Sequence, residues 1–254
     1  MKSGFTLPEV MITLVIVGVV FAITIPVVLN KIEDRQNIAK WKLLYSQIGD
    51  AFNSAYEETN HNSLCNGGDC VRYWNDEFIR TFIGKFEVID ECGRYNTNEA
   101  GCGSLGMGQT SNFNPDHIWA SQYHNITSYK TLAKGSMNAY DFDKVAFLLK
   151  NGATVYMGGS HNGPTIMVDV NNAANGPNIL GKDLFGIVCL PTNSCTHLVP
   201  EGTKGTQCSE NQSYCSTMYR GAGSSGCSPD IGAKNADYVF EAAGAGCAFK
   251  YLLE

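Results

Sequence analysis

A long apolar stretch near the start of the chain is the most pronounced pattern in the sequence. Residues 10–29 contain no charged side chain. A helix of about 20 residues is about 30 Å long, which matches the hydrocarbon thickness of a lipid bilayer. The stretch therefore predicts one membrane-spanning helix.

Apolar residues return with a different spacing in residues 30–58. They recur every three or four positions, which places them on one face of a helix. They are Trp41, Leu44, Ile48, Ala51, Phe52 and Ala55. One helix is therefore expected from about Phe5 to about Glu57, apolar all round in its first half and amphipathic in its second half. The amphipathic half needs a surface to cover it.

Four segments predict the strands of that surface. Asn151-Gly152 is the strongest short hairpin signal, and apolar segments at 142–150 and 153–157 flank it. The segments 165–170 and 184–190 predict two further strands. The predicted fold class is therefore α+β, with a long N-terminal helix packed on an antiparallel sheet.

The remaining segments have little periodicity. Residues 59–138 are rich in Asn, Gly, Ser and Cys, and the tail 191–254 holds five cysteines. Both segments predict disulfide-stapled loops, with one short helix expected at 71–79. Residues 59–254 are therefore expected to form one globular head.

All ten cysteines follow the apolar stretch. They are Cys65, Cys70, Cys92, Cys102, Cys189, Cys195, Cys208, Cys215, Cys227 and Cys247. An even number fits five disulfides, and no pair has the C-x-x-C spacing of zinc ribbons or thioredoxin-like sites. Because disulfides persist in oxidising compartments, residues 30–254 are expected outside the cytoplasm. Cys65 with Cys70 and Cys92 with Cys102 are the expected local pairs, since short separations need the least chain closure.

The charge distribution changes the picture in two ways. The chain has 18 basic and 24 acidic side chains, a net charge of -6, so bulk charge predicts no binding to nucleic acid. Lys2 precedes the apolar stretch. By the positive-inside tendency, the N-terminus stays in the cytoplasm and the head lies beyond the membrane.

The leader before the apolar stretch is short and ends in glycine. Met1-Lys2-Ser3-Gly4 precedes Phe5-Thr6-Leu7-Pro8-Glu9. A secretory signal peptide has its cleavage site after the apolar stretch, whereas here the cleavage site would lie before it, so the span is retained in the product. Residues 2–9 resemble the prepilin signal of type IV pilins and type II secretion pseudopilins.

This resemblance implies a processing route and a set of partners. A prepilin peptidase would cut between Gly4 and Phe5, and the new amine of Phe5 would be N-methylated. The partners would be other pilin or pseudopilin subunits and an inner-membrane assembly platform. The protein would span the bacterial cytoplasmic membrane once and then enter a pilus or pseudopilus.

Glu9 is the one carboxylate at the start of the span. A carboxylate inside hydrocarbon costs about 2.5–3.5 kcal/mol, so it normally marks a function or a partner. The resemblance implies that Glu9 pairs with the N-terminal amine of a neighbouring subunit during assembly. The alternative is that Glu9 lies at the headgroup level and complements the positive end of the helix dipole.

Pro26 interrupts the span near its outer end. Proline removes one backbone donor and clashes with the preceding turn, so the helix is expected to kink or loosen there. Similar pilins lose helicity around such a proline when they pack in a filament. An ordinary kinked membrane anchor is the alternative.

The segment 169–183 concentrates oxygen-bearing side chains between two predicted strands. Asp169, Asn171 and Asp183 would suit calcium, because that ion prefers hard oxygen ligands on a tight loop. Asn, Asp, Gly and Pro are also what a turn between strands uses. The turn is favoured because no EF-hand spacing is present. No other cofactor is predicted.

Enzyme signatures are weak. Residues 101–106 and 221–226 both fit G-x-G-x-x-G, but neither follows a convincing strand, and Asp183 stands where the P-loop-like segment 176–182 needs Ser or Thr. Zinc-protease and serine-nucleophile motifs are absent. No enzymatic activity is therefore predicted.

The expected domain organisation is a leader at 1–4, a membrane or filament-core helix at 5–29, an amphipathic helix at 30–58 and an extracytoplasmic head at 59–254. The predicted function is that of a structural subunit, minor or specialised, of a type IV pilus or a type II secretion pseudopilus. The alternative is a membrane-anchored extracytoplasmic binding protein or enzyme that does not assemble into filaments.

Overall fold

The computed structural model describes part of the chain. The described residues are 6–62, 74–93, 129–130, 132, 134, 145–160, 163–189, 195, 197–201, 203, 227 and 244–253. Their order of elements is α1 (Leu7–Glu58), α2 (Asp76–Ile83), β1 (Val88–Gly93), β2 (Val145–Leu149), β3 (Thr154–Ser160), β4 (Gly163–Asp169), η3 (Ala173–Asn175), β5 (Leu184–Cys189), β6 (Leu198–Pro200) and α4 (Ala245–Leu253).

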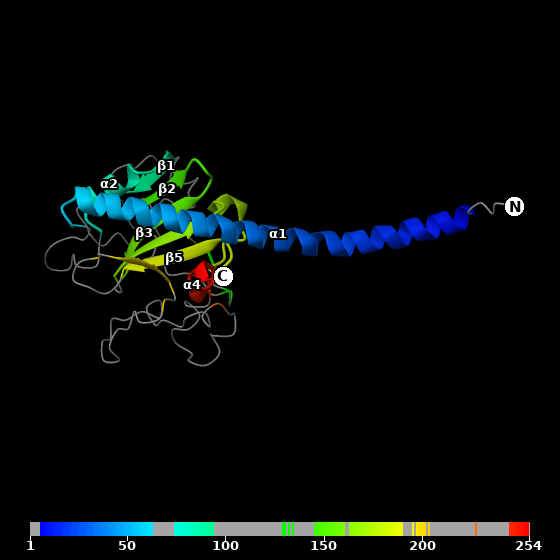
Figure 1. Cartoon of the computed structure of the whole chain (residues 1–254). Helices are drawn as coiled ribbons and strands as arrows, with labels where there is room; N and C mark the ends of the chain where they lie inside the picture. The colour runs from blue at the N-terminus through cyan, green and yellow to red at the C-terminus, as the bar shows by residue number, and fades with distance from the viewer. Residues whose placement is uncertain are drawn as a thin grey trace.

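Helix α1 is a single helix of 52 residues, within two residues of the predicted bounds. Its second half lies across the sheet, and its first half projects far beyond the head (Figure 1). The buried residues of the second half are Asn37, Trp41, Leu44, Ile48, Ala51, Phe52 and Ala55. The apolar face predicted from the spacing of residues 41–55 is therefore the face that packs on the head.

The sheet has six strands in the order β1-β2-β3-β4-β5-β6, all antiparallel. The hairpin between β2 and β3 turns at Asn151-Gly152, and Gly152 has a φ of 87°, which favours glycine. The α+β class and the long helix on an antiparallel sheet are thus confirmed.

Three elements lie where loops were expected. β1 and β6 are the two edge strands, and the C-terminal helix α4 lies in the cysteine-rich tail. β6 has only three residues, and β1 carries a register shift between Val88 and Asp90, so neither strand has a run of alternating residues. The short helix expected at 71–79 is α2, shifted because the Asn75 side chain caps its start by accepting from the backbone N–H of Glu77 and Phe78.

The core lies between α1, α2 and one face of the sheet. The indole ring of Trp41 stacks on Phe185 of β5 with ring centroids 4.8 Å apart. A second group of rings begins at Phe52 of α1, whose centroid is 5.3 Å from that of Phe78 in α2, and reaches Phe147 of β2 through Phe82. Aromatic pairs at these separations stabilise a core beyond the area that they bury.

The opposite face of the sheet is also buried. Side chains alternate between the two faces of a strand, so Val155 and Val168 face α1 whereas Tyr156 and Asp169 face away from it. Both Tyr156 and Asp169 are nevertheless 0% exposed. The head therefore has a second interior layer, which contains polar groups.

Candidate functional site

The start of α1 is held by a contact between Thr6 and Glu9. Thr6 precedes the helix in an extended conformation, and its backbone N–H and hydroxyl both donate to Glu9 Oε2 over 2.8 Å. Pro8 lies in the first turn, where a missing N–H costs no helical hydrogen bond. A carboxylate here also faces the positive end of the helix dipole. Glu9 is thus satisfied within its own chain, while Gly4 and Phe5 lie outside the described residues.

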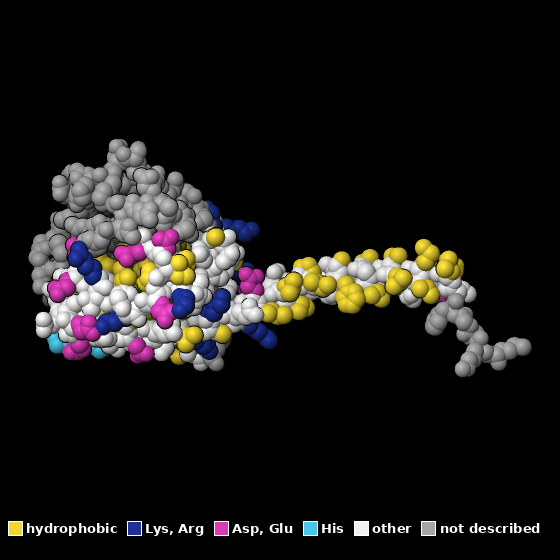
Figure 2. Space-filling view, turned by 90° about the horizontal axis from the view of Figure 1, so that it is seen from above, with side chains coloured by type: hydrophobic (Ala, Val, Ile, Leu, Met, Phe, Trp, Pro, Cys, Tyr) yellow, Lys and Arg dark blue, Asp and Glu magenta, His cyan; other side chains and the backbone are white. Residues whose placement is uncertain are grey.

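Apolar side chains surround the projecting half of α1 (Figure 2). From Leu7 to Leu29 the large apolar side chains are 44–78% exposed. An 18-residue window within this half has a mean hydropathy of 2.9, and none of its residues is buried. Burying one such side chain is worth about 1.5–3 kcal/mol, so contact between this surface and water is unfavourable.

Pro26 lies inside α1, and the helix continues through it. The projecting part is gently curved (Figure 1). The loosening expected at Pro26 therefore does not end the helix in the isolated subunit, and a loss of helicity within a filament stays a prediction.

A family comparison decides what this N-terminal segment is. Residues 1–25 match the family model of the prokaryotic N-terminal methylation motif. The chain carries a prepilin-type signal. No curated protein and no solved structure matches the chain. The family evidence therefore comes from the first tenth of the sequence, and the fold of the head comes from the structure.

The prepilin-type signal agrees with the geometry of α1. It spans the leader, the Thr6 and Glu9 contact and most of the exposed apolar half. It supports a pilin-like or pseudopilin-like protein, and a signal of this type implies processing by a prepilin peptidase and assembly with other pilins. The exposed apolar half, most of which the signal includes, is consistent with membrane anchoring.

The structure brings Asp169, Asn171 and Asp183 into one loop behind the sheet. The two oxygens of Asp183 accept the backbone N–H of Asn178 and Ile179, each over 2.7 Å. These bonds shape a turn, as expected for aspartate between two strands. Within the described segments, no three His, Cys, Asp or Glu side chains form a group that would hold a metal. Calcium binding at this loop stays a prediction.

A chain of hydrogen bonds leads from Tyr156 in β3 through Tyr129 to Asp169. The Tyr129 hydroxyl donates to Asp169 Oδ2 over 2.6 Å, so the Tyr156 hydroxyl donates to that of Tyr129 over 2.8 Å. Burial raises the pKa of both tyrosines. Burial also raises the pKa of Asp169 to about 6, although the hydrogen bonds from Tyr129 and the Asn171 N–H oppose that shift. The sequence held no signal for Tyr129, which comes from an aperiodic segment.

Glu201 is a buried carboxyl group that the sequence did not single out. It follows β6 and is 0% exposed, and among the described residues neither of its oxygens has a hydrogen-bond partner. Its side chain lies directly over Gly186 of β5, where a Cβ atom would overlap Glu201 Oε2. Burial raises the pKa of Glu201 to about 8, so the folded head holds it as a neutral acid at neutral pH. Only the pairing of the edge strand β6 with β5 creates this environment.

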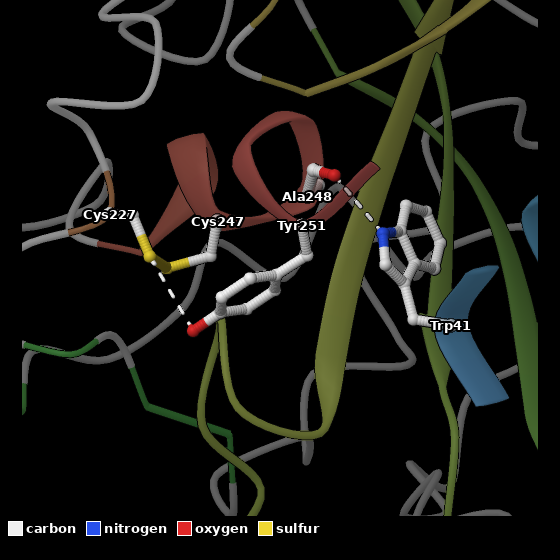
Figure 3. Close-up of a disulfide and its surroundings, with 5 residues drawn as sticks. All are labelled: Trp41, Cys227, Cys247, Ala248 and Tyr251. Carbon is white, nitrogen blue, oxygen red and sulfur yellow. Dashed lines mark hydrogen bonds between the residues drawn. A yellow bond between two sulfur atoms is a disulfide. The ribbon is translucent and has the colours of Figure 1, made fainter. Parts of the chain in front are cut away.

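One cross-link joins the C-terminal helix α4 to Cys227, which lies 20 positions before Cys247 in the chain. Cys227 and Cys247 form a disulfide, and the Tyr251 hydroxyl donates to Cys227 Sγ over 3.7 Å (Figure 3). Cys195 is buried and also disulfide-bonded. The expected pairs Cys65 with Cys70 and Cys92 with Cys102 lie outside the described side chains, as do the bonds of the other cysteines.

A groove of about 660 Å³ opens between α1, the α2–β1 connection and the β2–β3 hairpin. Ala51, Phe86 and Leu149 are among its apolar lining residues. Its two lysines are already paired, because Lys85 contacts Glu58 and Lys150 Nζ lies 2.7 Å from Glu87 Oε2. These pairs link the groove walls, and the exposed Asp50 also lines the groove.

Proposed function

We propose that this protein is a structural subunit of a helical envelope filament, either a type IV pilus or a type II secretion pseudopilus. A prepilin peptidase removes residues 1–4, and Phe5 becomes the N-methylated first residue. The observation that carries this proposal is the methylation motif at residues 1–25, which includes most of an uncovered apolar half-helix.

The shape of α1 supports assembly as the task of the subunit. Its apolar half is stable in a membrane before assembly and among other apolar helices afterwards, because both surroundings keep water away from it. Its amphipathic half is fixed to the head by a continuous buried face. Repeating one contact between copies displaced along an axis generates a filament.

The head supports a minor or specialised role. Ten cysteines in one chain are many, and the described Cys227 to Cys247 disulfide joins the C-terminal helix to a distant part of the cysteine-rich tail. A cross-linked head of this size suits a subunit that presents loops at a defined position. The protein carries no catalytic role in this proposal.

Processing provides the first test. The full chain is produced in a bacterium with and without a prepilin peptidase, and the intact mass is measured. We expect the loss of residues 1–4 and the gain of one methyl group only when the peptidase is present. Gly4→Val should retain the leader, whereas Ser3→Ala, one residue away, should be processed normally.

Assembly provides the second test. Filaments sheared from cells that carry the assembly machinery should contain the processed chain, identified by mass. A chain that keeps Met1, or that is cut beyond Leu29, would contradict the proposal and favour a membrane-anchored binding protein or enzyme. Processed protein that never enters a filament would also contradict it.

A further inference from the structure

The groove of about 660 Å³ in the head has three walls that contact one another. Lys85 of the α2–β1 connection contacts Glu58 of α1, and Lys150 of the β2–β3 hairpin contacts Glu87 of the connection. The backbone N–H of Lys150 also donates to the carbonyl oxygen of Glu87 over 2.9 Å. The groove is therefore already formed in the free subunit, which lowers the entropy lost when a partner binds.

The groove has apolar lining residues, among them one aromatic ring. Ala51 and Leu149 are buried, whereas Phe86 is partly exposed. The ring of Phe86 is fixed by those of Phe82 and Phe147, whose centroids lie 5.2 and 5.7 Å away. A fixed ring loses little side-chain freedom when a partner covers it, and the face of an aromatic ring attracts cations.

One carboxylate in the groove is left over once the ion pairs are counted. The two lysines of the groove pair with Glu58 and Glu87, whereas no ion pair among the described residues includes Asp50. Asp50 is exposed and stands on the α1 wall. Gln47 and Ser54 line the same wall three and four positions away, so they are neighbours of Asp50 on the helix surface. This wall therefore presents one negative charge between two polar side chains.

Strand β1 exposes a further apolar side chain close to the groove. Ile89 follows the groove residue Glu87 by two positions, which is about 7 Å along an extended chain. Ile89 lies at the register shift between Val88 and Asp90 and is 64% exposed. Such shifts re-aim a side chain at the edge of a sheet. A protein segment that enters the groove can also cover Ile89, whereas a small molecule inside the groove leaves it in water.

We propose that this groove binds a segment of another protein that carries a lysine or arginine next to an apolar side chain. The cation meets Asp50 on the α1 wall, and the apolar side chain lies against Phe86 and Leu149. Acidic segments are excluded, because they would face the carboxylate of Asp50. The inference concerns the head alone, so it does not depend on whether the chain enters a filament.

The charge of Asp50 selects the partner more than it tightens the contact. Complementary charges mainly give specificity, and an ion pair at an exposed carboxylate contributes little to affinity. The expected effect of the charge is therefore a change of about two- to fivefold in Kd.

The experiment titrates the full chain, in a nonionic detergent, with short peptides and follows the methyl NMR signals of its leucines. The probe is acetyl-Gly-Leu-Lys-Gly-amide. The comparison peptide carries acetyllysine at the same place, which removes the charge and keeps the stem. The lysine peptide should shift the signals of Leu149, with a Kd about two to five times lower than that of the comparison peptide.

Asp50→Asn should remove this preference for lysine, because the amide keeps the shape of the carboxylate and lacks its charge. Asp34→Asn is the matched control, since Asp34 is an exposed carboxylate on the same helix and does not line the groove. This control should keep the wild-type preference. Leucine signals away from the groove check that each variant is folded.

Three results would overturn the inference. The first is that neither peptide moves the Leu149 signals. The second is that Asp50→Asn keeps the preference for lysine, or that a peptide with glutamate in place of lysine binds as tightly. The third is that the Leu149 signals shift with the concentration of the chain itself when no peptide is present, because a second copy would then be the occupant.

Discussion

The indole N–H of Trp41 donates a hydrogen bond to the backbone carbonyl oxygen of Ala248 over 3.1 Å, across 207 residues of sequence. Trp41 lies in α1 and Ala248 in α4, and both are buried (Figure 3). This bond joins the first helix of the chain to the last one. The C-terminal segment is thus fixed to the helix that carries the prepilin-type signal.

Trp41→Phe should loosen α4 without removing the stack on Phe185. The phenyl ring lacks the donor, and a buried carbonyl left without its partner costs about 1–3 kcal/mol of unfolding free energy. Urea unfolding of the full chain in detergent measures that loss, and hydrogen exchange locates it in the amides of α4. Trp74→Phe removes a similar bond to the Thr165 carbonyl and should leave α4 protected. Unchanged exchange in α4 of Trp41→Phe would contradict this account.

Removal of the Cys227 to Cys247 disulfide should destabilise the head by about 3 kcal/mol, since the bond closes a loop of 20 residues. The variant is Cys227→Ser with Cys247→Ser, measured by urea unfolding. Faster hydrogen exchange should appear in α4 before α2. Alkylation of the unreduced wild-type chain should label none of the ten cysteines, and labelling of several would contradict the extracytoplasmic assignment.

Glu201 should make the head less stable as the pH rises. Its pKa is about 8 in the folded state against 4.5 for an ordinary glutamate, so the unfolded chain releases this proton first. The contribution of this proton to the free energy of unfolding is complete below pH 4.5. It is lost as the pH rises to about 8, and the free energy of unfolding falls by at most about 1.4 kcal/mol per pH unit.

Glu201→Gln tests this pH dependence. The amide has the same shape but no proton to release, so the urea midpoint should no longer fall between pH about 6 and about 8, a range above the pKa of Asp169. Glu87→Gln, at an exposed carboxylate, should keep the wild-type slope. An unchanged slope in Glu201→Gln would show that another group titrates in this range.

Asp183→Ala should lower the melting temperature equally with and without calcium. The substitution leaves the N–H groups of Asn178 and Ile179 without acceptors, at a cost of about 1–3 kcal/mol whatever ion is present. If the loop holds calcium instead, a hundredfold excess over Kd stabilises the wild-type head by about 2.7 kcal/mol, and the variant loses that gain. Melting curves in calcium and in chelator distinguish the two readings.

Glu9→Gln should remain in the membrane but fail to enter filaments. Glutamine still accepts from Thr6, as in a capping box, so the start of α1 stays capped while the charge is lost. Thr6→Ala makes the opposite change, because it removes one cap donor and keeps the carboxylate, and it should assemble. Wild-type amounts of Glu9→Gln in sheared filaments would refute a pairing between Glu9 and a neighbour's amine.

Local patterns were enough to predict several parts of this protein. The apolar run 10–29, the spacing of residues 41–55 and the Asn151-Gly152 turn each depend on neighbours within a few residues. The structure has the long helix, its buried face and the hairpin at those positions. The leader and Glu9 could also be recognised from the sequence, because a peptidase signal is a short linear motif.

Only the tertiary structure decided the edges of the sheet and the polar layer behind it. β1 and β6 are too short or too irregular for a period to appear, and they become strands by pairing with β2 and β5. The burial of Glu201 over Gly186 and the bond from Trp41 to Ala248 join residues far apart in sequence. Such contacts form only when the tertiary fold brings distant segments together, and no local spacing in the sequence predicts them.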